Sequence, residues 1–88
     1  MRSHELRAAG LATALGTVLD ALGEYAEAEP LLRNAVQAYE TAYGPDDPRL
    51  APPLRALGDA CAARGRLAEA EELYLRVLSL VHRTQEES

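Results

Sequence analysis

The sequence contains no tryptophan, phenylalanine, isoleucine or lysine among its 88 residues. Several residues that favour strands are therefore missing, whereas alanine, leucine, arginine and glutamate, which favour helices, are abundant. The composition predicts helices throughout. A chain of this length forms a single domain, residues 1–88, and buries only about two-thirds of its unfolded surface, so we expect a thin margin of stability.

A single cysteine, Cys61, argues against an internal disulfide and against a zinc site. No run approaches the roughly 20 apolar residues of a membrane-spanning helix, and Met1–Glu5 leads into no apolar stretch of signal-peptide length. We therefore expect a cytoplasmic location. Cys61 falls on the same side of a helical pattern as Leu54 and Leu57, so we interpret it as a buried core residue rather than a nucleophile.

Positive charge is limited to nine arginines, against fourteen aspartates and glutamates, which gives a net charge of −5. This balance argues against nucleic acid and anionic membranes as partners, because both require a clustered basic face. His4 and His82 have no histidine four residues away and no nearby cysteine, and no glycine-rich phosphate loop follows a strand. We therefore expect no enzyme, no cofactor and no metal site. Acidic residues near expected helix starts complement the helix dipole, namely Glu27, Glu29, Glu69, Glu71 and Glu72.

The sequence repeats itself at an offset of 42 residues. The stretch GEYAEAEPL at 23–31 returns as GRLAEAEEL at 65–73, and ALG at 14–16 returns as ALG at 56–58. Each unit holds two helical segments with a glycine between them. The pattern predicts four helices, near 4–22, 25–43, 48–64 and 67–85, arranged as one repeat over about 4–43 and a second over about 48–85.

Glycine and proline mark the boundaries of these helices. Gly23 and Gly65 fit the position just past a helix end, where a left-handed backbone is needed. Gly16 and Gly58 fall inside helices, where glycine costs about 1 kcal/mol relative to alanine, so we expect each to allow a close helix approach. The stretch GPDDP at 44–48 predicts the turn between the repeats, and the proline pair at 52–53 predicts a delayed or kinked third helix, with a single turn at 48–51.

These features resemble the tetratricopeptide repeat. The residues that carry the resemblance in the first copy are Leu15, Gly16, Leu19, Gly23, Ala28, Leu32 and Ala35, and their counterparts in the second are Leu57, Gly58, Cys61, Gly65, Ala70, Tyr74 and Val77. The 42-residue period and the GPDDP connector are similar to the longer repeats of the kinesin light chain type. The resemblance implies an all-α fold, a right-handed α-α superhelix of two helical hairpins, that acts as a protein-interaction scaffold.

The resemblance also implies a concave groove lined by the inner face of the first helix in each repeat. The candidate groove residues for binding a peptide are Thr13, Thr17, Asp20, Arg55 and Asp59. Leu11, Leu15, Val18, Leu19 and Leu22 lie on the other arc of the first helix, which predicts that they form the core. Arg55 is the only positive groove candidate, and Asp59 lies four residues on, so we expect the two to pair with each other rather than to clamp a ligand carboxylate.

The last helix carries an apolar arc of roughly 160°, wider than the ~100° stripe of a helix with one buried face. Two apolar contacts are therefore expected, and a module of only two repeats leaves the second one uncovered. The candidate interface residues at this edge are Leu73, Val77 and Leu80, with Leu75 at the rim.

Three classes of function remain open at this point: a binding module, an oligomerisation module, and an enzyme or nucleic-acid-binding protein, against which the composition and the missing motifs argue. The chain is an adaptor or scaffold that binds a peptide or protein partner in the groove, or it is an oligomerisation module that closes its exposed edge on a second copy to form a homodimer or larger assembly.

Overall fold

The computed structural model describes residues 2–87, and it contains four α-helices in this range. Helix α1 spans Arg2–Ala21, α2 spans Tyr25–Tyr43, α3 spans Ala51–Ala63 and α4 spans Leu67–Glu87. A short 3₁₀ turn, η1, covers Pro48–Leu50. The predicted all-α fold of four helices is confirmed, and three of the four helices begin and end within two residues of the predicted positions.

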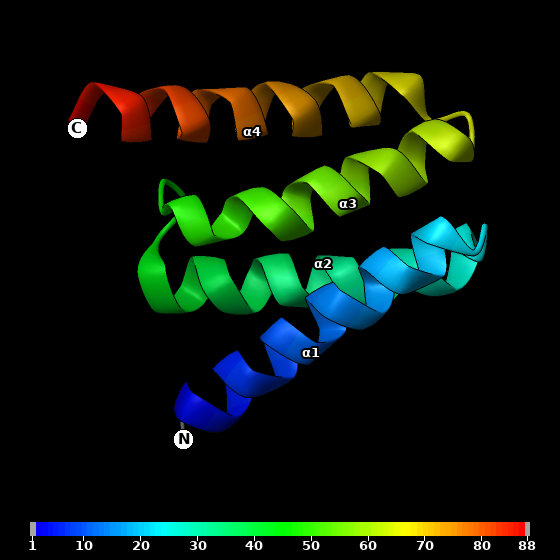
Figure 1. The fold of residues 1–88 in the computed structure, drawn as a ribbon, viewed down its shortest axis with the longest axis horizontal. Coiled ribbons are helices and arrows are strands. Elements are labelled where there is room, and N and C mark those ends of the chain that lie inside the picture. The colour runs from blue at the N-terminus through cyan, green and yellow to red at the C-terminus, as the bar shows by residue number, and fades with distance from the viewer. Residues whose placement is uncertain (1, 88) are drawn as a thin grey trace.

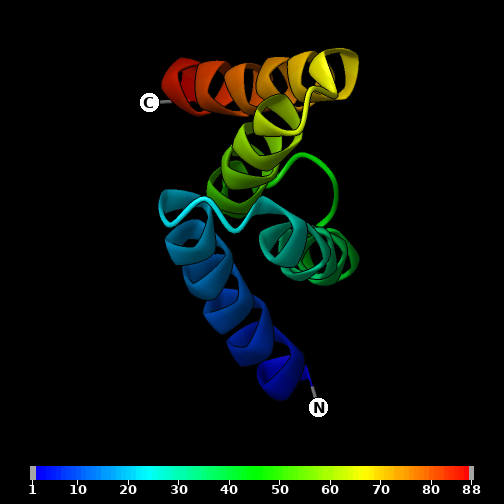
Figure 2. The same ribbon diagram turned by 90° about the vertical axis from the view of Figure 1, so that its right-hand side faces the viewer.

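The helices pack as two hairpins, α1 with α2 and α3 with α4, and α3 also contacts α2 and α1. Figure 1 shows the hairpins stacked, with α4 at one end of the molecule and α1 at the other. The view turned by 90° shows the same order, so α1 and α4 form the two opposite ends of the stack (Figure 2).

Glycines close the two hairpin corners and end the first repeat, as the sequence predicts. Gly23 and Gly65 have φ angles of 81° and 82°, and Gly44 at the end of α2 has a φ of 90°. These left-handed conformations strain residues that carry a Cβ. The backbone N–H groups of Gly23 and Gly65 donate to carbonyls in the last turns of α1 and α3, so these helix ends are capped within the chain.

Gly16 of α1 and Gly58 of α3 lie where the second helix of the same hairpin packs closely against the first. A Cβ on Gly16 would lie 2.6 Å from two carbon atoms of Leu32, and a Cβ on Gly58 would lie 2.7 Å from Cε1 of Tyr74. Real Cβ atoms do not reach such distances. The predicted packing role of both glycines is therefore confirmed, and the two contacts are related by the 42-residue repeat.

The proline pair delays the third helix as predicted. Asp47 caps the turn η1 by accepting a hydrogen bond from the Arg49 backbone N–H through its side chain. Helix α3 then begins at Ala51, which places Pro52 and Pro53 in its first turn. The first N–H groups of a helix have no partner inside it, so prolines at these positions remove no helical hydrogen bond.

The core joins both hairpins. Its buried residues are Ala28, Leu32, Val36, Leu50, Leu54, Ala56, Leu57, Cys61, Ala70 and Leu80. Cys61 is fully buried, and burial raises the pKa of its thiol, which fits the predicted packing role rather than a nucleophile.

The prediction for the core face of α1 is wrong for four of its five residues. Leu19 packs against the core, but the others are exposed, at 50–72% of their surface: Leu11, Leu15, Val18 and Leu22. The residues of α1 that are buried are Ala9 and Gly16, because a close helix crossing requires small side chains. The leucines therefore lie toward the outer end of the stack.

An ion cluster around the buried Glu29 links the first hairpin to the corner of the second, and the sequence did not predict it. Glu29 of α2 is 8% exposed and pairs with Arg33, with Arg64 at the end of α3 and with Arg66 in the following turn, at 3.3, 3.2 and 2.9 Å. Burial opposes ionisation of Glu29, but the hydrogen bond from Arg33 and the charges of the three arginines outweigh it and hold its pKa below the usual value.

We expect Gly16→Ala to lower the free energy of unfolding by about 1–3 kcal/mol, because Leu32 is fully buried and cannot yield to a new Cβ. Gly58→Ala should cost less, since the Tyr74 ring is partly exposed and can move. Gly10→Ala is the matched control. A Cβ there meets only the Tyr39 hydroxyl at an ordinary 3.5 Å, so this change should raise stability by about 0.5–1 kcal/mol. Urea unfolding followed by circular dichroism measures all three, and a stabilising Gly16→Ala would refute the close crossing.

The depressed pKa of Glu29 means that its ion pairs stabilise the fold above the unfolded pKa of about 4.3 and that this contribution is lost as the pH falls through the lower folded value. We expect Glu29→Gln to lower the free energy of unfolding by about 1–3 kcal/mol at pH 7, with the difference shrinking below about pH 4. Glu27→Gln, an exposed change in the same helix turn, should shift stability by less than about 0.5 kcal/mol. Equal losses in both variants at pH 7 would contradict the role of the cluster.

Candidate functional site

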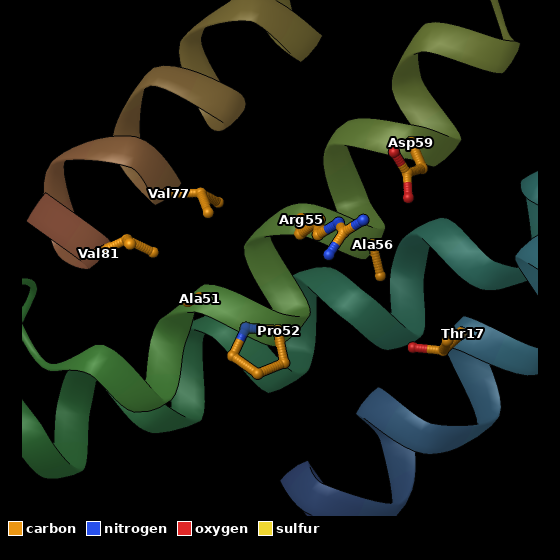
Figure 3. A pocket seen from close by; sticks show the side chains of 8 residues that line it. All are labelled: Thr17, Ala51, Pro52, Arg55, Ala56, Asp59, Val77 and Val81. Atoms are coloured by element: carbon orange, nitrogen blue, oxygen red, sulfur yellow. The ribbon is translucent and has the colours of Figure 1, made fainter.

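A concave hollow of about 490 Å³ opens between α1, α3 and α4. Figure 3 shows Arg55 and Asp59 extending from α3, with Thr17 of α1 on one side and Val77 and Val81 of α4 on the other. The remaining lining residues come from the first turns of α3: Ala51, Pro52 and Ala56. The floor is therefore largely apolar, with the charged groups of α3 along its middle.

A second hollow of about 380 Å³ continues the first toward the corner of the first hairpin. It adds Asp20, Ala21 and Tyr25 to residues that line both hollows: Thr17, Ala56 and Asp59. The two hollows form one concave surface, which we call the groove. Four of the five groove candidates from the sequence lie in it, namely Thr17, Asp20, Arg55 and Asp59. Thr13 lines neither hollow, and its hydroxyl donates to the Ala9 carbonyl at 2.8 Å.

The expected pairing of Arg55 with Asp59 is wrong. Asp59 instead accepts a hydrogen bond of 2.5 Å from the Tyr74 hydroxyl, because the close approach at Gly58 brings that ring against α3. Burial raises the pKa of Tyr74 to about 12, and the bond to Asp59 acts in the same direction. Among the described residues Arg55 has no hydrogen-bond or ion-pair partner, so its guanidinium lies exposed in the groove with its donors free.

Asp20 lies at the other end of the groove and has no hydrogen-bond partner in the described part of the chain. Both of its carboxylate oxygens are buried. Burial raises its pKa, and the negative charge of Asp59 raises it further. The groove thus holds Arg55 together with Asp59 in its first hollow, near Val77, and a second carboxyl, that of Asp20, at the end near Tyr25.

The predicted edge residues of α4 lie inward, which corrects the prediction. Leu80 is 4% exposed, and Leu73 and Val77 pack against the core, because residues spaced by three and four along α4 share the face that contacts α3. Val77 also lines the groove. The exposed apolar residues of α4 are Leu67, Tyr74, Leu75, Leu78 and Val81. The sequence placed most of these on the wide apolar arc, but it could not show which part of the arc α3 covers.

The residues that the structure describes contain no group of three or more histidine, cysteine, aspartate or glutamate side chains able to hold a metal ion. None of the described helices is long and apolar enough to cross a membrane. His4 and His82 are both exposed, as expected for surface histidines.

The model of one protein family, the tetratricopeptide repeat, matches residues 7–81. The chain belongs to the tetratricopeptide repeat family. Members of this family are generally protein–protein interaction modules and are typically not catalytic. A search of curated proteins found no significant match to this tetratricopeptide repeat chain.

We expect Asp20→Asn to raise the free energy of unfolding by about 1 kcal/mol at pH 7, because it removes a buried charge that has no hydrogen-bond partner in the described part of the chain. The folded pKa of Asp20 is raised, so the penalty on the wild-type carboxyl is fully present above that pKa. The advantage of the variant should shrink as the pH falls through the folded pKa and vanish below the unfolded pKa of about 3.9. Glu5→Gln, at an exposed carboxyl of the same helix, is the control and should change stability little. Urea unfolding at pH 7 and pH 3 tests the prediction, and a destabilised Asp20→Asn at pH 7 would contradict it.

Proposed function

We propose that this tetratricopeptide repeat chain is an adaptor that binds a segment of a protein partner in its groove. The observation that carries the proposal is Arg55, whose guanidinium has no hydrogen-bond or ion-pair partner among the described residues and lies beside the apolar side chains of Val77 and Val81 in the groove. A free guanidinium in such a place supplies charge-assisted hydrogen bonds to a carboxylate. Family membership supports a polypeptide as the partner.

The lining of the groove indicates the chemistry of that segment. Val77 and Val81 offer apolar contact beside Arg55, and Pro52 presents an exposed ring on the other side. A short segment with one acidic residue flanked by small or medium apolar side chains satisfies both features. The acidic end of the groove at Asp20 and Asp59 disfavours a second acidic group there, so the proposed ligand is amphipathic rather than strongly charged.

The proposal treats residues 1–88 as one functional unit of two repeats, about 4–43 and 48–85. It also includes the subtype of the family: the 42-residue period and the GPDDP connector support repeats of the kinesin light chain type. A cytoplasmic location is part of the same proposal.

Selection from a displayed library of random 12-residue peptides against the immobilised chain tests this function without knowledge of the natural partner. We expect selected peptides to share one acidic residue next to apolar ones. Arg55→Glu should weaken their binding by about tenfold or more, because it replaces the donor with a repelling charge. Fluorescence anisotropy with labelled peptides measures the affinity.

Arg7→Glu is the matched control, since Arg7 is exposed on α1 outside the groove and the change in net charge is the same. Its affinity for the selected peptides should stay within about twofold of the wild type. Peptides that bind Arg55→Glu and the wild type equally well, or that perturb no NMR signal of Thr17, Arg55 or Asp59, would refute the groove as the binding site.

A further inference from the structure

Helices α1 and α4 form the two ends of the stack (Figures 1 and 2), and each of them exposes a row of apolar side chains. We call the first row the α1 stripe, which consists of Leu11, Leu15, Val18 and Leu22. The second row, the α4 stripe, consists of Leu67, Tyr74, Leu75, Leu78 and Val81. Contiguous exposed apolar surfaces of this kind mark interaction sites.

The internal repeat shows what the α1 stripe is shaped to contact. Leu11, Leu15 and Val18 correspond, 42 residues on, to Pro53, Leu57 and Ala60 of α3, which are all buried. Both helices have the partner of their own hairpin, but only α3 has another hairpin packed before it. The difference in burial therefore comes from the contact of α3 with the preceding hairpin, and the α1 stripe is the same contact surface left open.

The α4 stripe is the other half of that contact. Tyr74 and Leu78 correspond to Leu32 and Val36 of α2, which are 0% and 7% exposed because α2 has a hairpin packed after it. We call the contact between α2 and α3 the joint. The α4 stripe corresponds to the α2 side of this joint, and the α1 stripe corresponds to its α3 side.

A paired change at one corner of the joint favours a second copy as the occupant. Within one copy, Arg33 of α2 and Arg64 of α3 both form ion pairs with Glu29. The corresponding residues are Leu75 and Leu22, which are 57% and 69% exposed. If only one of these two positions were a leucine, that leucine would face an arginine across the contact. Because both Leu75 and Leu22 are leucines, the two can form an apolar contact in place of the two arginines.

We propose that copies of this chain associate head to tail, with the α4 stripe of one copy packed on the α1 stripe of the next as α2 packs on α3. The two contact surfaces are different, so each copy keeps one free end after pairing and the association is open-ended. The α4 stripe shares Val81 with the groove, so this packing reaches one edge of the groove, whereas Thr17, Arg55 and Asp59 belong to neither stripe.

The charges at the rim of the joint make the proposal more specific. The third partner of Glu29 is Arg66, at 2.9 Å. The residues that correspond to Glu29 and Arg66 are Glu71 and Glu24, both exposed. Two carboxylates therefore meet where the internal joint has an ion pair. This repulsion weakens the association and should be relieved by salt.

The experiment uses one variant for each stripe. Leu15→Glu blocks the α1 stripe and Leu78→Glu blocks the α4 stripe, and both positions are at least half exposed, so neither change should unfold the chain. Circular dichroism checks the fold. In sedimentation velocity we expect the wild type to form a concentration-dependent series of oligomers, each variant alone to stay monomeric, and an equimolar mixture of the two to form a heterodimer and nothing larger.

Other outcomes overturn the proposal. A wild type that stays monomeric up to millimolar concentration would show that no copy covers the stripes. Dimers of Leu15→Glu alone would show that two α4 stripes pair face to face, and dimers of Leu78→Glu alone would show the same for two α1 stripes.

A gain of affinity tests the register of the joint. Glu24→Arg, placed in the Leu78→Glu variant whose α1 stripe is intact, restores the counterpart of the Arg66–Glu29 pair against Glu71 of the other copy. We expect it to lower the dissociation constant of the heterodimer by about threefold, the value of an exposed ion pair. The matched change Glu5→Arg should lower it less. An unchanged or higher dissociation constant for Glu24→Arg would refute a joint built like α2–α3.

Discussion

In each hairpin the two helices cross at a glycine, and this crossing determines which sides of the helices remain exposed. At Gly16 and Gly58 the partner side chain occupies the place of a Cβ, so the helices approach closely and small residues form the contact. In α1 this rotates the leucines away from α2. In α3 the same geometry brings the Tyr74 hydroxyl to Asp59, and Arg55 is left without its neighbour on the helix. The exposed leucines of α1 and the free guanidinium of Arg55 in the groove thus both follow from the close crossing at a glycine.

The joint between the hairpins combines apolar burial with a fixed charge. Leu32 and Leu54 are fully buried there, but apolar contact alone permits helices to slide along one another. Glu29 removes that freedom, since a carboxylate in this position is stable only where Arg64 and Arg66 reach it from the second corner. The cluster therefore sets the register of the joint, whereas the apolar residues supply most of its stability.

The sequence predicted the elements well because the repeat, the glycines and the prolines are local signals. A single turn after Asp47, the delayed start of α3 and the packing roles of Gly16 and Gly58 could all be derived from residue type and spacing, although the predicted turn at 48–51 is one residue longer than the observed one. Most of the groove could also be predicted, since the family resemblance gives the inner face of α1 and α3. Val77, Val81 and Tyr25 were missed as lining residues because they enter the groove from the second helix of each hairpin.

The direction of the apolar faces could not be predicted. A helical wheel gives the angle between Leu80 and Leu78, but both lie on one wide arc, and only the position of α3 decides that Leu80 is 4% and Leu78 61% exposed. The same ambiguity placed the α1 leucines in the core. Glu29 was missed for a related reason. An acid near a helix start has a sufficient explanation in the helix dipole, and two of its three partners, Arg64 and Arg66, lie 35 and 37 residues further along the sequence.

The proposed stacking would also give a role to Thr13, the groove candidate that lines neither of the two hollows of the groove. Thr13 and Thr17 correspond to Arg55 and Asp59, which line the groove where α3 lies between α1 and α4. In a head-to-tail pair, α1 of the second copy takes the place of α3, so its Thr13 and Thr17 would line a new hollow beside Asp59 of the first copy. Each joint would thus extend the groove across two copies. A partner with several binding segments would then gain affinity from their linkage, because binding of the first segment raises the effective concentration of the next.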